Sequence, residues 1–148
     1  GGLGGLARIL RAYYEDRLTY YAVDLPETLA IQEWFLRACF PTTPTAFKGG
    51  RAKVQFKRGG LNFVNAYVLE SQNIGFDAAV NIDSMQEMNE DAVRAYIRYF
   101  EDNISERGVF YFQNPGPMRK LLPKSSAYFQ GMPEDMAKSF ADKSMGYG

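Results

Sequence analysis

The glycine-rich start of the chain constrains its fold more than any other stretch. Residues 1–6 (GGLGGL) lead into an apolar helix pattern and then into a short run of β-forming residues that ends at Asp24. Because glycine lacks a Cβ, its backbone can approach a ligand closely, and the first turn of a helix offers free N–H groups to an anion. A carboxylate about 20 residues further along can accept hydrogen bonds from ribose hydroxyls. Residues 1–24 therefore predict a nucleotide-binding unit.

The glycine cluster alone leaves several interpretations open. Gly2, Gly4 and Ala7 fit the G-x-G-x-x-G/A dinucleotide fingerprint, so the same residues suit a nicotinamide cofactor. A flexible or tag-like terminus is the plainer alternative. A folded unit is favoured because apolar side chains follow at helical spacing, and we expect this stripe to be packed: Leu6, Ile9, Leu10, Tyr13 and Tyr14. A glycine turn of this kind needs a strand before it, so we expect the chain to begin inside its first motif.

Composition favours one globular domain and argues against several classes of protein. The chain has 148 residues, of which 46% are hydrophobic and 15% aromatic, enough to form a core. Its 17 basic and 17 acidic residues cancel, so net charge gives no case for nucleic acid or an anionic membrane as partner. A single cysteine, Cys39, excludes an internal disulfide framework, and no apolar run approaches the roughly 18 residues of a membrane span. With no signal peptide visible, we expect a cytoplasmic protein.

The absence of histidine narrows the chemistry. The chain contains none, which removes histidine metal ligands, the Ser-His-Asp triad and the commonest general base. We accordingly predict no metal site.

The remaining pattern predicts alternating strands and helices, which is typical of an α/β fold with a parallel sheet. We expect Val80 and Ile82 to lie in a buried strand, and Trp34 to belong to the core rather than to a substrate platform. The second helix should pack through Ile31, Trp34, Phe35 and Ala38. The predicted strands cover 18–23, 61–66, 76–82 and 109–113, and the predicted helices begin near Gly5, cover 27–40, and run from the N-cap Asn89 to Gly108.

Two segments depart from this alternation of strands and helices. Residues 41–60 contain prolines and two Gly-Gly pairs, and we interpret them as an inserted loop or small hairpin. Their basic side chains form either a solvated face or a cleft rim that attracts phosphate: Lys48, Arg51, Lys53, Lys57 and Arg58. From Asn114 onward, prolines argue against another regular strand pair, so we expect an irregular tail from about residue 115 with only a modest helical signal over 133–142.

The order of these motifs resembles a class I S-adenosylmethionine-dependent methyltransferase, and most closely a family of sugar O-methyltransferases. The resemblance covers roughly residues 1–115 and is carried by GGLGGLARIL, YYAVDLPE, FDAAVNIDSMQEMNEDAVRAYI and GVFYFQNP, of which D-S-x-Q-E-M is the most specific part. It implies a Rossmann-like sheet of which this chain holds the second to the fifth strand. The first strand and the last two would be missing, so residues 1–148 would form a partial methyltransferase domain.

The resemblance also implies which residues bind the cofactor. The residues that it assigns to S-adenosyl-L-methionine are Gly2, Gly4, Asp24, Leu25, Asn65, Ala66, Asp83, Ser84 and Gln86. Among these, Asp24 corresponds to the acid that binds the ribose, and Asn65 and Ala66 would lie near the adenine. Asp83 begins the loop that lines the cofactor and faces the acceptor.

The chemistry implied is methyl transfer to a hydroxyl of a sugar, sugar nucleotide or glycolipid. Without histidine, the candidate bases in this chain are Glu87 and Asp83, and the C-terminal part that the resemblance implies to be missing is an equal alternative source. Plainer roles remain open: Asp24 as a turn residue, Asp83 and Ser84 as helix caps, and Glu87 as a solvated acid at a helix start. Two other functions also remain open, an NAD-dependent oxidoreductase and a non-catalytic interaction domain, although the D-S-x-Q-E-M loop favours the methyltransferase.

Overall fold

Two small parallel sheets organise the chain in the computed structural model, which describes residues 2–50, 54–113 and 129–131. One sheet lies in the unit Gly1–Asn73 and the other in the unit Ile74–Gly148. The first has the strand order β1-β3-β2 and the second β4-β5-β6. Every strand pair is parallel, so the expected mixed α/β class with parallel strands is correct.

The first sheet is built around a fully buried central strand. β3 (Leu61–Asn65) lies between β1 (Tyr20–Asp24) and β2 (Thr45–Lys48), and all five of its residues are buried. Leu61, Phe63 and Val64 supply its apolar side chains, and its two buried asparagines, Asn62 and Asn65, are hydrogen-bonded. Asp24 pairs in register with Asn65, so both residues lie at the carboxyl edge of this sheet.

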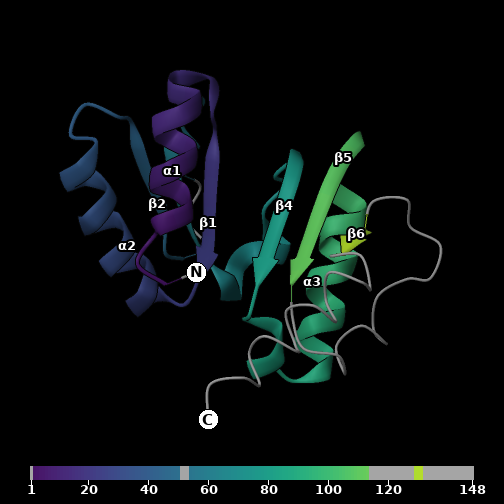
Figure 1. The fold of residues 1–148 in the computed structure, drawn as a ribbon. Coiled ribbons are helices and arrows are strands. Elements are labelled where there is room, and N and C mark those ends of the chain that lie inside the picture. The colour runs from purple at the N-terminus through teal and green to yellow at the C-terminus, as the bar shows by residue number, and fades with distance from the viewer. Residues whose placement is uncertain (1, 51–53, 114–128, 132–148) are drawn as a thin grey trace, which may run out of the picture. The chain divides into compact units, whose positions relative to one another are not determined.

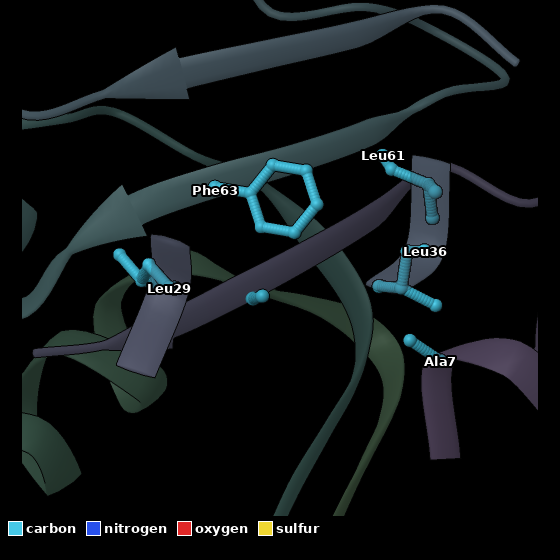
Figure 2. Packing of buried hydrophobic residues seen from close by; sticks show 6 residues of the cluster. Ala7, Leu29, Leu36, Leu61 and Phe63 are labelled. Carbon is cyan, nitrogen blue, oxygen red and sulfur yellow. The ribbon is translucent and has the colours of Figure 1, made fainter. Parts of the chain in front are cut away.

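Two helices cover one face of the first sheet. α1 (Gly5–Tyr14) and α2 (Pro26–Cys39) meet the strands in a core of six buried residues: Ala7, Ala22, Leu29, Leu36, Leu61 and Phe63. Figure 2 shows Ala7 from α1 and Leu36 from α2 converging on Leu61. Because Ala22 and Phe63 are neighbours in the register, both helices pack on the same face of the sheet.

The link between α1 and β1 fixes the direction of the first helix. Only the short helix η1 (Glu15–Arg17) and two further residues join them, so α1 runs back alongside β1. Arg11 holds this turn, because its guanidinium donates to the carbonyl oxygens of Glu15, of Leu18 at 3.5 Å and of Gly59 at 2.7 Å. The amino end of α1 therefore lies at the carboxyl edge of β1 (Figure 1).

The second sheet packs against a single helix, α3 (Glu90–Asn103), among the described residues. Its strands are β4 (Phe76–Ile82), β5 (Ile104–Gln113) and β6 (Phe129–Gly131). The core between helix and sheet contains Ala79, Met85, Val93, Ile97, Phe110 and Phe112. Asn89 caps α3 as predicted, because its side chain accepts a 2.8 Å hydrogen bond from the backbone N–H of Ala92.

Three predicted boundaries need correction. The segment 41–60 is not simply a loop or hairpin, because Thr45–Lys48 forms the strand β2, parallel to β3. α3 ends at Asn103 rather than near Gly108, since the chain becomes extended at Ile104 and Gly108 lies inside β5. The sheet does not stop at β5, because Phe129–Gly131 pairs parallel with it; the helical signal over 133–142 lies outside the described residues.

The predicted buried stripes of the helices are wrong in part. On α1 only Ala7 is buried, and Leu6, Ile9, Tyr13 and Tyr14 are exposed. On α2 the buried residues are Leu29, Gln32 and Leu36, so Ile31 and Trp34 lie on the outer side, and Trp34 is not a core residue. Each helix carries apolar residues on more than one side, which is why spacing alone selected the wrong one.

The strand β4 is also less buried than predicted. Ala79 packs in the core with α3. Because side chains alternate along a strand, Val80 and Ile82 lie on the opposite face of β4, where they are 45% and 44% exposed. Among the described helices, none is long and apolar enough to cross a membrane.

Candidate functional site

The carboxyl edge of the first sheet gathers most of the predicted cofactor residues. Asp24 and Leu25 end β1 and lead into α2, and Asn65 and Ala66 end β3 beside them. The glycine turn before α1 reaches the same edge because α1 runs antiparallel to β1. Ligands of parallel α/β sheets bind outside the carboxyl ends of the strands. This edge is therefore the candidate site of the first unit.

Asp24 is partly buried, and hydrogen bonds hold its carboxylate. Oδ1 accepts from the backbone N–H of Leu25 at 2.8 Å, and Oδ2 accepts from Nε2 of Gln32 at 3.2 Å. The side chain is thus turned toward the first turns of α2. A carboxylate held in this way accepts further hydrogen bonds at little additional ordering cost.

Gln32 is the residue that sequence reasoning missed at this edge. It is 3% exposed and stands between Leu29 and Leu36 on the buried side of α2. The sequence did carry a signal for it. Gln32 is a polar residue on the same side of the helix as Leu29 and Leu36, and this helix directly follows a strand that ends with an acidic residue. A buried polar side chain at such a place calls for a polar partner, and Asp24 provides it.

The two predicted glycines have different local reasons for being glycine. Gly4 is buried with φ of 90°, and a Cβ there would lie 3.2 Å from Cδ1 of Leu36. Close packing of the turn on α2 and the left-handed backbone together account for Gly4. Gly2 is exposed with φ of 56°, and a Cβ on it would meet no atom within 4 Å. Gly2 is therefore the glycine whose backbone is accessible to a ligand.

Asn65 already uses its side chain to shape the edge. Its Nδ2 donates to the carbonyl oxygen of Gly49 at 3.1 Å, and its Oδ1 accepts from the backbone N–H of Tyr67 at 3.0 Å. These bonds tie the end of β3 to the residue after β2 and start the short helix η2 (Ala66–Ser71). Asn65 thus has a structural role, and Ala66, partly buried after it, offers apolar surface at the predicted adenine position.

The basic residues of 41–60 do not form one solvated face. Lys48, at the end of β2, is 2% exposed, whereas Lys57 and Arg58 are exposed. Arg51 and Lys53 lie outside the described residues. The interpretation as a phosphate-attracting rim therefore cannot include Lys48 as a surface charge.

The loop after β4 forms a tight turn at the carboxyl edge of the second sheet. Asp83 has φ of 50°, an uncommon value for a residue other than glycine, and its N–H donates to the carbonyl oxygen of Gln113 at 2.7 Å. The hydroxyl of Ser84 accepts from Nδ2 of Asn81 at 2.8 Å. Aspartate adopts this left-handed conformation more readily than most residues, so the tight turn accounts for the backbone of Asp83 without indicating a function.

In the rest of the loop, the candidate base Glu87 and the residue that caps α3 are different residues. Glu87 is exposed in the short helix η3 (Met85–Glu87), which begins without a side-chain cap from Ser84. The cap of α3 is Asn89, so capping of that helix does not explain Asp83 or Ser84. Gln86 lies in η3, and its side chain is outside the described part of the structure.

The structure thus brings Gly2, Gly4, Asp24, Leu25, Asn65 and Ala66 to one edge of one sheet, and describes Asp83, Ser84 and Glu87 within the other unit. Within the described ranges, no group of three or more acidic or cysteine side chains is arranged to hold a metal ion. Comparison with known proteins finds no match for the chain among family models, curated proteins or solved structures.

Proposed function

We propose that this chain binds S-adenosyl-L-methionine at the carboxyl edge of its first sheet and forms part of an O-methyltransferase with a Rossmann-like sheet. The observation that carries the proposal is the placement of Asp24. Its carboxylate ends β1, is oriented by Leu25 and Gln32, and shares an edge with the positive-φ glycines Gly2 and Gly4. A fixed carboxylate beside an accessible glycine backbone suits the ribose and the chain of an adenosyl cofactor.

The residues of this edge have distinct roles in the proposal. Asp24 accepts from the ribose hydroxyls, and Ala66 offers apolar surface to the adenine. The exposed backbone of Gly2 allows close approach of the cofactor. Asn65 supports the edge through its backbone contacts rather than by direct binding.

The proposed reaction is methyl transfer to a sugar hydroxyl. The bound sulfonium supplies an activated methyl group, so the protein chiefly has to orient two ligands and exclude water. A sugar hydroxyl is a weak nucleophile and gains from a base that removes its proton, a contribution of about 10² to 10⁴ in rate. Asp83 and Glu87, in the D-S-x-Q-E-M loop, are the proposed sources of that base.

Titration calorimetry tests the cofactor directly. We expect S-adenosylmethionine and S-adenosylhomocysteine to bind the chain, and NAD to bind more weakly. Preferential binding of NAD would favour the oxidoreductase, because the glycines and Asp24 also fit a nicotinamide cofactor. Absence of binding by all three would contradict the proposal. If the adenosyl ligands bind, transfer of a labelled methyl group to a sugar nucleotide distinguishes an enzyme from a binding domain.

A further inference from the structure

Gln32 is a polar residue at a position that packing would assign to an apolar one. It follows Leu29 by three positions and precedes Leu36 by four, so the three side chains lie on the same side of α2. Leu29 and Leu36 are fully buried, and Gln32 is 3% exposed. Burying a side-chain amide is costly unless its groups find hydrogen-bond partners. The position therefore needs a reason other than packing.

The contact that Gln32 makes supplies this reason. Its Nε2 donates to Oδ2 of Asp24 at 3.2 Å, while Oδ1 of the same carboxylate accepts from the N–H of Leu25 at 2.8 Å. One oxygen is thus held by the backbone at the start of α2 and the other by a side chain from within α2. With both oxygens bonded, rotation of the carboxylate is restricted.

We propose that Gln32 is a positioning residue for Asp24, which fixes the carboxylate in the orientation that receives the ribose of the cofactor. This inference rests on the proposed function. Its physical basis is preorganisation: a side chain that is already ordered loses less conformational entropy on binding. Gln32 does not touch the cofactor in this account, and its effect passes through Asp24.

The direct test compares ligand affinity with protein stability in a Gln32→Met variant. Methionine keeps the length of the side chain and removes the amide, so the buried side of α2 becomes fully apolar. We expect the melting temperature to change little, because Asp24 is only partly buried and water can replace the amide as donor to Oδ2. S-adenosylhomocysteine should nevertheless bind about 3-fold to 10-fold more weakly, the range that corresponds to one ordinary hydrogen bond. If Gln32 had only a structural role, the variant would lower the melting temperature and the affinity together.

A double-mutant cycle ties the effect to Asp24. In an Asp24→Asn background, Gln32→Met should cause little further loss of affinity, because the carboxylate that it orients is gone. Gln55→Met, at an exposed residue, is the matched control and should change neither affinity nor stability. If Gln32→Met misfolds, Gln32→Glu provides a second variant. It keeps the shape of the side chain but places a second carboxylate beside Asp24, and it should also weaken binding at neutral pH.

The outcomes separate this inference from the function on which it rests. No binding of S-adenosylhomocysteine by the wild-type chain would overturn both. Binding that Asp24→Asn weakens but that both Gln32 variants leave unchanged would overturn the positioning role alone. Losses that simply add in the double mutant would also overturn it, because Gln32 would then act independently of Asp24.

Discussion

Asp24 combines a structural and a proposed binding role in one side chain. Its Oδ1 accepts from the N–H of Leu25, the residue that precedes the first turn of α2, and its Oδ2 accepts from the side chain of Gln32 in the same helix. An aspartate that only ended a strand would need the first contact but not the second. The buried glutamine is therefore what distinguishes Asp24 from an ordinary turn residue.

Replacing Asp24 by Asn tests the proposed ribose contact. The change keeps the shape and removes the charged acceptor, and a hydrogen bond to a charged group is worth about 1.5 to 3 kcal/mol. We expect the affinity for S-adenosylhomocysteine, measured by calorimetry, to fall roughly 10-fold to 150-fold. Asp16→Asn, at an exposed residue in η1, is the matched control. An Asp24→Asn variant that binds as tightly as the wild type would contradict the assignment.

Tyr20 gives a pH dependence to the stability of the first unit. Burial raises the pKa of its phenol above the ordinary value of 10.0. Above about pH 10 the unfolded chain loses this proton while the folded chain keeps it, so the free energy of unfolding falls as the pH rises. Below that pH the phenol is neutral in both states and has no effect. Urea unfolding of Tyr20→Phe should show a smaller fall above about pH 10 than the wild type.

The control for this measurement is Tyr67→Phe, because Tyr67 is 80% exposed. Its fall in stability with pH should match that of the wild type. A Tyr20→Phe variant with the same pH dependence as the wild type would refute the role of the buried phenol.

At the scale of the elements, the turn before β3 shows that 41–60 is part of the first unit. Gly59 has φ of 65°, its N–H donates to Oγ1 of Thr19 at 2.9 Å, and its carbonyl accepts from Arg11. A Cβ at this position would stand 2.6 Å from the carbonyl oxygen of Asp16. The end of the segment, at Gly59, is thus fixed against the turn between α1 and β1.

Gly59→Ala is therefore expected to be costly. The left-handed backbone alone disfavours alanine by about 1 to 2 kcal/mol, and the contact with the backbone of Asp16 adds to this. Chemical denaturation should show a loss at least of that size. Gly50→Ala is the matched control, because a Cβ there meets no atom within 4 Å, and its effect should stay within about 0.5 kcal/mol. Equal stability of the two variants would mean that the turn is not packed as described.

The sequence predicted those elements whose signals come from residues close together in the chain. Asn89 was predictable as a cap because a cap is recognised from its neighbours in the sequence. The four-residue strand β2 was missed because its pairing partner β3 lies beyond a glycine-rich stretch. Gln32 was missed because it lies on the buried side of α2, whereas the spacing of apolar residues had predicted that another side was buried.

Trp34 reports which side of α2 packs. It is the only tryptophan of the chain and is 73% exposed, on the side opposite the buried Leu29 and Leu36. We expect the native fluorescence to have the emission maximum of a solvated indole, with acrylamide quenching close to that of the urea-unfolded chain. A blue-shifted emission protected from acrylamide would instead support the packing first predicted from spacing.

At the scale of the whole molecule, the chain forms two units, each with its own parallel sheet. The α/β class followed from the alternation of apolar segments, but membership of a sheet depends on non-local pairing that spacing does not encode. The candidate residues follow this division. Those proposed for the ribose and the adenine belong to the first sheet, and the D-S-x-Q-E-M loop belongs to the second.

NMR titration can show residue by residue whether the carboxyl edge of the first sheet binds an adenosyl cofactor. Amide resonances of the ¹⁵N-labelled chain would be followed as S-adenosylhomocysteine is added. We expect saturable shifts that are largest at Gly2, Gly4, Leu25 and Ala66. Saturable binding that leaves these amides unmoved, or no saturable shift anywhere in the spectrum, would contradict the proposal.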